Sequence, residues 1–171
     1  PWHALLGTRG NREALWAAGP GNHPAYLHMN GQEVFQFALK TVPELARSLL
    51  DKAGMDRDQI DWYVLHQANH RILEGVAKRM KVPLERFYEN IGRYGNTSAA
   101  TIPIALDEMA EQELLRPGQW IMCLGFGAYF CFGVREVLPG YYDENRITSY
   151  SDGVFRMNLA GIALNNRNWP H

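Results

Sequence analysis

The sequence has few of the features that mark secreted, membrane or nucleic-acid-binding proteins. Its two cysteines, Cys123 and Cys131, are too few for a disulfide framework, and without nearby histidines they form no zinc signature. It has no apolar run of about 18 residues and no signal peptide, so we expect a cytoplasmic protein without a membrane partner. The formal net charge of −1, with 20% charged residues, argues against a nucleic-acid partner.

Apolar periodicity indicates a single α/β domain. A chain of 171 residues can bury a sizeable core. The pattern predicts, in order, a helix at 33–53, a strand at 61–66, a helix at 69–80, a strand at 86–91, a helix at 98–115, and strands at 119–125 and 130–138. This αβαβαββ order favours a mostly parallel sheet with helices on its faces. Pro43 is expected to kink the first helix or to start a second one.

The two ends of the chain lack this periodicity. Residues 1–28 are rich in glycine and proline and are interpreted as a loop-rich lead segment, with residues 4–6 and 15–18 as its ordered parts. Residues 29–138 form the predicted domain. Residues 139–171 show no clean period, so we interpret them as an extra C-terminal tail of unknown role.

The most informative stretch is 61–72, DWYVLHQANHRI, where a strand, a polar cluster and a helix start meet. His66 and Gln67 follow four strand-forming residues, at the point where a strand would reach the carboxyl edge of a sheet. Open α/β sheets place their ligand sites at that edge. Asn69 is a suitable N-cap for the following helix, whose apolar residues fall on one face.

Two further motifs follow at similar strand ends. Residues 94–105 (YGNTSAATIPIA) supply three capping side chains, and residues 125–128 (GFGA) follow an apolar strand. Together with HQAN-x-RI and MNGQEVFQFA at 29–38, they resemble the C-terminal half of β-ketoacyl-acyl-carrier-protein synthase III, of the thiolase superfamily. The resemblance covers about residues 22–138. It implies half of the five-layered αβαβα thiolase-like fold.

The chemistry of the family needs hydrogen-bond donors for an enolate. Decarboxylation of malonyl-carrier puts negative charge on the thioester oxygen, and a neutral imidazole N–H and an amide NH₂ can both donate to it. His66 and Asn96 are the candidates, and the resemblance assigns the same pair. A second oxyanion site, for the acyl thioester, is implied at the backbone amide of Ala128. The next position is usually glycine in the family but is Tyr129 here.

Carrier binding is implied for the segment after the histidine, which comprises Gln67, Ala68, Asn69, His70 and Arg71. Acyl carrier proteins are acidic, so a basic surface would steer them. Further positive charge comes from Lys78, Arg79, Lys81 and Arg86. For Lys78, Lys81 and Arg86 the rival interpretation is an ordinary solvated helix face.

No residue of this chain fits the family's nucleophile. The catalytic cysteine of the family lies in the N-terminal half, at the start of a buried helix that lowers its pKa. Cys123 and Cys131 lie in strand-like sequence and are interpreted as small hydrophobes. We therefore expect this chain to be inactive without a cysteine-bearing N-terminal half, and to pair with such a half or to form a homo-oligomer.

The function that the resemblance implies is the condensation of an acyl-CoA with malonyl-acyl-carrier protein in fatty-acid initiation, without a cofactor. A type III enzyme of a specialised polyketide pathway is one alternative. Another superfamily member, such as a thiolase, a hydroxymethylglutaryl-CoA synthase or a plant-type polyketide synthase, is disfavoured by HQAN-x-RI. A third alternative is a truncated or split chain that acts as a non-catalytic partner.

Overall fold

The computed structural model describes residues 2–7, 14–17, 27–127 and 130–136. Its main sheet has the strand order β1-β6-β5-β4. The strands are β1 (Trp2–Gly7), β4 (Trp62–Leu65), β5 (Trp120–Gly125) and β6 (Phe130–Glu136). β4 and β5 are parallel, whereas β1 with β6 and β5 with β6 are antiparallel. The α/β class is therefore confirmed, but the described sheet is mixed and not mostly parallel.

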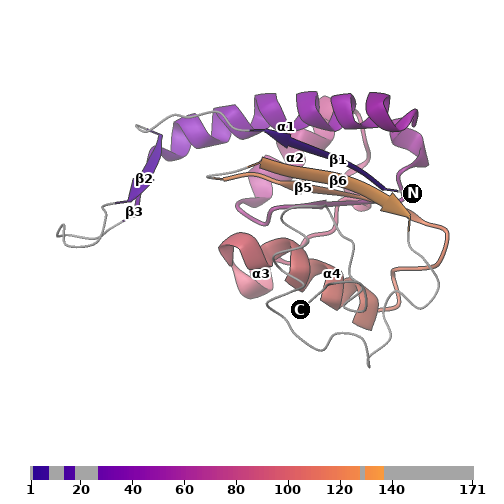
Figure 1. Ribbon diagram of the computed structural model, residues 1–171. Coiled ribbons are helices and arrows are strands. Elements are labelled where there is room, and N and C mark those ends of the chain that lie inside the picture. The colour runs from indigo at the N-terminus through magenta and orange to yellow at the C-terminus, as the bar shows by residue number, and fades with distance from the viewer. Residues whose placement is uncertain (1, 8–13, 18–26, 128–129, 137–171) are drawn as a thin grey trace, which may run out of the picture.

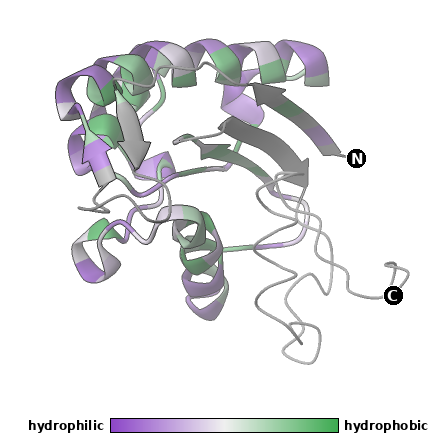
Figure 2. Ribbon diagram, turned by 60° about the vertical axis from the view of Figure 1, so that its left-hand side comes forward, coloured by the Kyte–Doolittle hydropathy of each residue, from purple (hydrophilic) through white to green (hydrophobic). Residues whose placement is uncertain are grey.

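Helices cover both faces of the sheet. The helices are α1 (Gly31–Ala53), α2 (His70–Met80), α3 (Ile91–Tyr94) and α4 (Thr101–Glu111). In Figure 1, α1 and α2 lie on one side of the sheet, and α3 and α4 lie on the other. The core is divided in the same way, with a large apolar cluster under α1 and α2 and a smaller one under α4. Figure 2 shows hydrophobic and hydrophilic stretches alternating along these helices, as expected for helices with one face on a core.

Helix α1 follows its sequence signals except at Pro43. The side chain of Asn30 accepts a hydrogen bond from the Glu33 N–H at the start, and Gly54 ends the helix with a φ of 66°. Pro43 is buried inside this one helix, so no second helix begins there. Burial of Val42 and Ala46 on either side, both fully shielded from solvent, offsets the hydrogen bond that proline cannot make.

The segment between α2 and α4 departs most from the prediction. Residues 86–91 do not form a strand; a 3₁₀ turn at Leu84–Arg86 is followed by a single parallel bridge between Tyr63 and Phe87. The expected helix at 98–115 is a 3₁₀ turn, Ser98–Ala100, followed by α4. The structure explains the missing strand. The buried side chain of Gln67 binds the Tyr88 carbonyl and the Asn90 N–H, which are backbone groups that a neighbouring strand would otherwise have bound.

The lead segment is more ordered than its composition suggests. β1 completes the main sheet along β6, and β2 (Leu15–Ala17) pairs with β3 (Leu27–Met29) in a small separate sheet. In Figure 1 this small sheet lies at the N-terminal end of α1. The predicted tail at 139–171 lies outside the described residues. Within the described ranges, no helix is both long enough and apolar enough to cross a membrane.

The packing of α2 on the sheet leads to a stability prediction. Leu73 is completely buried in the large cluster, so Leu73→Ala should lower the free energy of unfolding by about 2–5 kcal/mol. Leu84→Ala is a matched control, because Leu84 is 37% exposed and its truncation should cost under about 1 kcal/mol. Urea unfolding of the three proteins measures both values. Equal losses for the two variants would show that α2 does not pack as described.

Candidate active site

His66 extends the parallel ladder by one residue beyond β4. Its backbone N–H donates to the Leu124 carbonyl at 2.9 Å, so the backbone is fixed at the predicted edge of the sheet. The ring packs edge-on against Phe126, with 5.1 Å between the ring centroids and an interplanar angle of 83°. Phe126 belongs to the GFGA motif, so two of the predicted motifs meet here. The Ala128 amide and Tyr129 lie outside the described residues.

The surroundings of His66 keep its imidazole neutral. Burial lowers the pKa of this side chain from 6.5 to about 4, because the charged form loses its hydration. Nδ1 of the ring lies 2.6 Å from Oγ1 of Thr101, the first residue of α4. At neutral pH the ring therefore carries a single N–H, which is the state that a neutral donor requires.

Asn96 lies on the turn before α4 and is exposed. Its Oδ1 accepts a hydrogen bond of 2.9 Å from the Ser98 N–H, which holds the amide plane. Since the oxygen is engaged in this way, the NH₂ group is the end of the side chain that can donate to a ligand. Asn96 is thus not the N-cap of α4, which is Ala100, but a donor held on a tight turn.

A chain of hydrogen bonds connects the two predicted donors. Ser98 donates its N–H to Asn96, and its carbonyl oxygen accepts the backbone N–H of Thr101, whose hydroxyl contacts His66. Ser98 adopts a φ of 54°, a left-handed conformation that costs energy for a residue with a Cβ. Such strain persists where the surrounding contacts enforce it and is common at functional sites. The structure therefore brings His66 and the Asn96 turn into one hydrogen-bonded unit.

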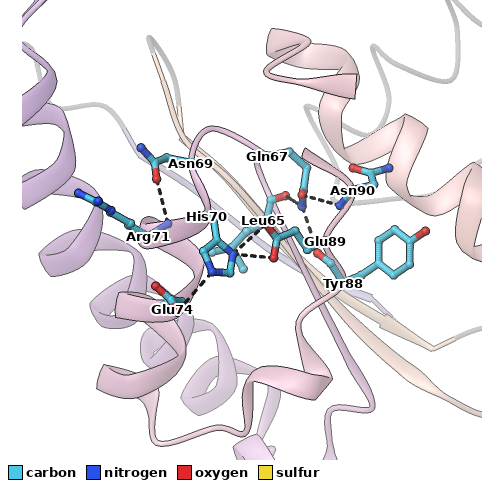
Figure 3. A network of polar contacts seen from close by, with 9 residues as sticks. All are labelled: Leu65, Gln67, Asn69, His70, Arg71, Glu74, Tyr88, Glu89 and Asn90. Atoms are coloured by element: carbon cyan, nitrogen blue, oxygen red, sulfur yellow. Dashed lines mark hydrogen bonds and ion pairs between the residues drawn. The ribbon is translucent and has the colours of Figure 1, made fainter. Parts of the chain in front are cut away.

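Gln67, predicted to bind a carrier, points into the protein and is 1% exposed. Its Nε2 donates to the carbonyls of Leu65 and Tyr88, at 2.9 and 3.1 Å, and its Oε1 accepts from the Asn90 N–H at 3.1 Å. Figure 3 shows this side chain between the end of β4 and the segment that holds Asn90. The side chain of Gln67 therefore lies beneath the predicted carrier-binding surface and does not form part of it.

The other members of the predicted carrier segment begin α2. Asn69 caps the helix as expected, because its Oδ1 accepts from the Arg71 N–H at 2.9 Å. Figure 3 shows His70 between Glu74 and Glu89, while Arg71 extends away from that cluster. The pKa of His70 is raised, chiefly by its hydrogen bond to Glu89. Asn69, His70 and Arg71 are exposed, whereas Ala68 packs partly against the core.

The remaining basic residues divide into two groups. Lys78, Arg79 and Lys81 are exposed at the end of α2. Arg86 instead donates to the carbonyls of Asp58 and Ile60, at 3.2 and 3.3 Å, and so holds two loops together. Arg86 therefore has a structural role. It is neither part of a solvated helix face nor a free charge that would steer a carrier protein.

Cys123 has the environment that its sequence context predicts. It lies inside β5, is 3% exposed, and burial strongly raises the pKa of its thiol. A thiol of this kind is protonated at neutral pH and is a poor nucleophile. The side chain of Cys131 lies outside the described part of the structure, although its backbone belongs to β6.

Sequence reasoning missed three residues that shape the site. Thr101 and Phe126 contact His66, and Glu108 of α4 binds the Asn90 side chain at 2.7 Å and pairs with Arg93. Thr101 and Phe126 lie within recognised motifs, so their position was a usable signal. Glu108 is 6% exposed on a helix predicted to be amphipathic, and nothing in the local sequence indicates its partners.

Comparison with solved structures gives the class of protein to which this fold belongs. The chain superimposes on the crystal structure of 3-oxoacyl-(acyl carrier protein) synthase III from Pseudomonas aeruginosa with a TM-score of 0.75 and 33% identity, over 80% of this chain and 44% of that one. The enzyme of the same name from Thermus thermophilus gives a TM-score of 0.72 and 34% identity, over 81% and 46% of the two chains. The described fold is therefore that of one part of a thiolase-like synthase.

The sequence comparisons give the family. Residues 50–134, which contain His66 and Asn96, match the family model described as 3-oxoacyl-(acyl-carrier-protein) synthase III, C terminal. The β-ketoacyl-(acyl-carrier-protein) synthase III of Acaryochloris marina is 50% identical over 107 residues, or 63% of this chain and 32% of that protein. The chloroplastic protein of Arabidopsis thaliana is also 50% identical, with 26% of its length covered. This region of the chain therefore corresponds to the C-terminal part of the β-ketoacyl-acyl-carrier-protein synthase III family, and the chain spans about a quarter to a third of the length of these relatives.

The buried neutral histidine makes stability depend on pH. Above pH 6.5, His66 is neutral in both the folded and the unfolded state, and its contribution to stability is fully present. As the pH falls from 6.5 toward 4, only the unfolded state takes up the proton, so the free energy of unfolding should fall by about 3 kcal/mol. Urea unfolding between pH 7 and pH 4.5 measures this change.

Two variants isolate this effect. His66→Gln should remove most of the loss between pH 7 and pH 4.5. His70→Gln should steepen the loss, because the raised pKa of His70 adds stability at low pH that disappears as the pH rises. A parent protein and a His66→Gln variant with the same pH profile would show that His66 is not buried in its neutral form.

Proposed function

We propose that this chain supplies the malonyl-decarboxylating residues of a type III ketoacyl synthase, which condenses an acyl-CoA with malonyl-acyl-carrier protein at the start of fatty-acid synthesis. The observation that carries the proposal is the hydrogen-bonded unit that connects His66 to the Asn96 turn, within the segment that matches the family model. Because the chain covers about a third of the relatives, the activity is proposed for a protein that also contains the remainder of the fold.

The proposed reaction places both donors on one oxygen. When the malonyl thioester loses CO₂, the electron pair of the broken C–C bond forms an enolate, and the negative charge develops on the thioester oxygen. A neutral His66 and the Asn96 amide each donate a hydrogen bond to that oxygen and lower the barrier. The enolate carbon then attacks the acyl thioester and releases the thiolate that carried the acyl group.

The residue that carries the acyl group lies, by family resemblance, in the other part of the fold. Cys123 does not replace it, because a buried thiol with a raised pKa is neither accessible nor ionised. The two substrates contain all the bonds that change, so the proposed reaction needs no dissociable cofactor. The backbone amide of Ala128 remains our candidate for the second oxyanion site.

A chimeric enzyme tests the roles of His66 and Asn96. The matched region of this chain would replace its counterpart in the Acaryochloris marina relative, which supplies the rest of the fold. His66→Ala or Asn96→Ala should each lower the rate of malonyl decarboxylation about 10²–10³-fold, as is usual for the loss of one oxyanion donor. The release of labelled CO₂ from malonyl-carrier measures the rate.

Glu111→Ala serves as the control, because Glu111 is exposed at the end of α4 farthest from Thr101 and lies outside the proposed carrier segment. It should leave decarboxylation within about twofold of the parent, as expected for a surface change away from the reacting atoms. Decarboxylation at the parent rate by both the His66→Ala and Asn96→Ala variants would rule out the proposed roles of the pair.

We further propose that an acyl carrier protein docks at the start of α2, with Arg71 as the main contact. Arg71 is exposed and faces away from the His70–Glu89 cluster, so its guanidinium is available to an acidic partner. In the chimera, Arg71→Ala should raise the KM for malonyl-carrier about 3–10-fold at low salt, with little change in kcat.

Arg79→Ala is the matched control for Arg71→Ala. Arg79 is an exposed arginine on the same helix, about 12 Å farther along its axis. Steady-state kinetics at two salt concentrations compare the variants, and equal effects of both substitutions would favour general charge over a docking contact.

The cytoplasmic location stays a prediction, since the Arabidopsis thaliana relative is named as chloroplastic.

A further inference from the structure

The Thr101 hydroxyl lies between two possible acceptors. Its Oγ1 is 2.6 Å from Nδ1 of His66 and 3.0 Å from the carbonyl oxygen of Ser98. The residue is 2% exposed. A hydroxyl has one proton and donates to only one of these groups at a time. Its choice determines which nitrogen of the neutral His66 ring carries the proton.

Two observations favour donation to His66. The 2.6 Å separation falls within the usual range for hydroxyl donors and is shorter than the usual N–H to oxygen distance of about 2.7–3.2 Å. The Ser98 carbonyl does not need the hydroxyl, because it already accepts the backbone N–H of Thr101. Nδ1 pairs with the hydroxyl in either arrangement, as the acceptor when Thr101 donates to it and as the donor when Thr101 donates to Ser98.

We propose that Thr101 is a positioning residue that donates its hydroxyl proton to Nδ1 of His66 and thereby keeps the ring proton on Nε2. This inference rests on the proposed function, and it adds the residue that makes His66 a donor. If the hydroxyl donated to Ser98 instead, Nδ1 would hold the ring proton and Nε2 would offer a lone pair. A lone pair would repel the oxyanion that the site has to stabilise.

The same turn then prepares both donors. The Ser98 N–H holds the Asn96 carbonyl oxygen and leaves the NH₂ group to donate, while Thr101 holds Nδ1 and leaves the Nε2–H to donate. In each side chain the acceptor atom is occupied by residues 98–101, and the donor atom is kept for the ligand. Donors oriented before the substrate binds need no rearrangement during the reaction.

Nitrogen-15 NMR of the 171-residue chain, labelled at its histidines, tests the proposal without an activity assay. Two-bond correlations from the ring protons distinguish a protonated from an unprotonated ring nitrogen. The chain has six histidines, so a His66→Gln sample identifies the His66 signals. At pH 7 the expected pattern is a protonated Nε2 and an unprotonated Nδ1. A protonated Nδ1 in the parent protein would overturn the proposal.

Two substitutions at Thr101 show whether its hydroxyl is the cause. Thr101→Val keeps the shape but removes the donor, and it should shift the tautomer ratio toward Nδ1–H at least about fivefold. Thr101→Ser keeps the hydroxyl and should retain the parent pattern. A Thr101→Val spectrum identical to the parent would contradict the proposal. If the valine variant does not fold, the parent and Thr101→Ser spectra still decide it.

The outcome is separable from that of the proposed function. A parent chain with Nε2–H, combined with a chimera in which His66→Ala decarboxylates normally, would leave Thr101 as a tautomer-setting residue and reject the enolate role. An Nδ1–H pattern would reject the role of Thr101, whatever the chimera shows. If both proposals hold, Thr101→Val should slow decarboxylation in the chimera about tenfold, and Thr101→Ser should restore it.

Discussion

The candidate site depends on the buried amide of Gln67. This side chain makes three hydrogen bonds, which tie the end of β4 to residues 88–90 in the absence of a neighbouring strand. Asn90 continues the network to Glu108 of α4, the helix whose first residue contacts His66. A buried polar network stabilises a fold only when its members are satisfied, so loss of this amide would leave three backbone groups without partners. Two segments of the site are held in place by one side chain.

The site combines a partly buried imidazole with a strained turn. Burial lowers the pKa of His66 and keeps it neutral, and the conformation of Ser98 is one that residues with side chains rarely adopt. Both features reduce stability, and both leave hydrogen-bond donors free to bind a negatively charged ligand. This pattern is typical of active sites, where local stability is lost in favour of pre-oriented groups.

Local sequence patterns predicted the parts of the fold that depend on local interactions. The Asn69 cap, the α2 stripe and the end of α1 at Gly54 follow from helix periodicity and capping. Residues 86–91 were predicted to form a strand, but beyond the single bridge at Phe87 they are held by the Gln67 side chain, which no periodicity reveals. β1 was missed because its hydrogen bonds go to β6 at the other end of the described chain. His66 and Asn96 were predicted from motifs, whereas the contact of Thr101 with His66 is seen only in the three-dimensional structure.

The pairing of β1 with β6 has a consequence for how the chain folds during synthesis. Trp2 lies opposite Arg135, so 133 positions separate the two residues of this pair. Loops of this length are slow to close, and proteins rich in such contacts have high contact order and fold slowly. A ribosome adds about 5–20 residues per second, so β6 is synthesised several seconds or more after β1. During that interval the growing chain exposes an unpaired strand edge, which is when a chaperone would be most useful.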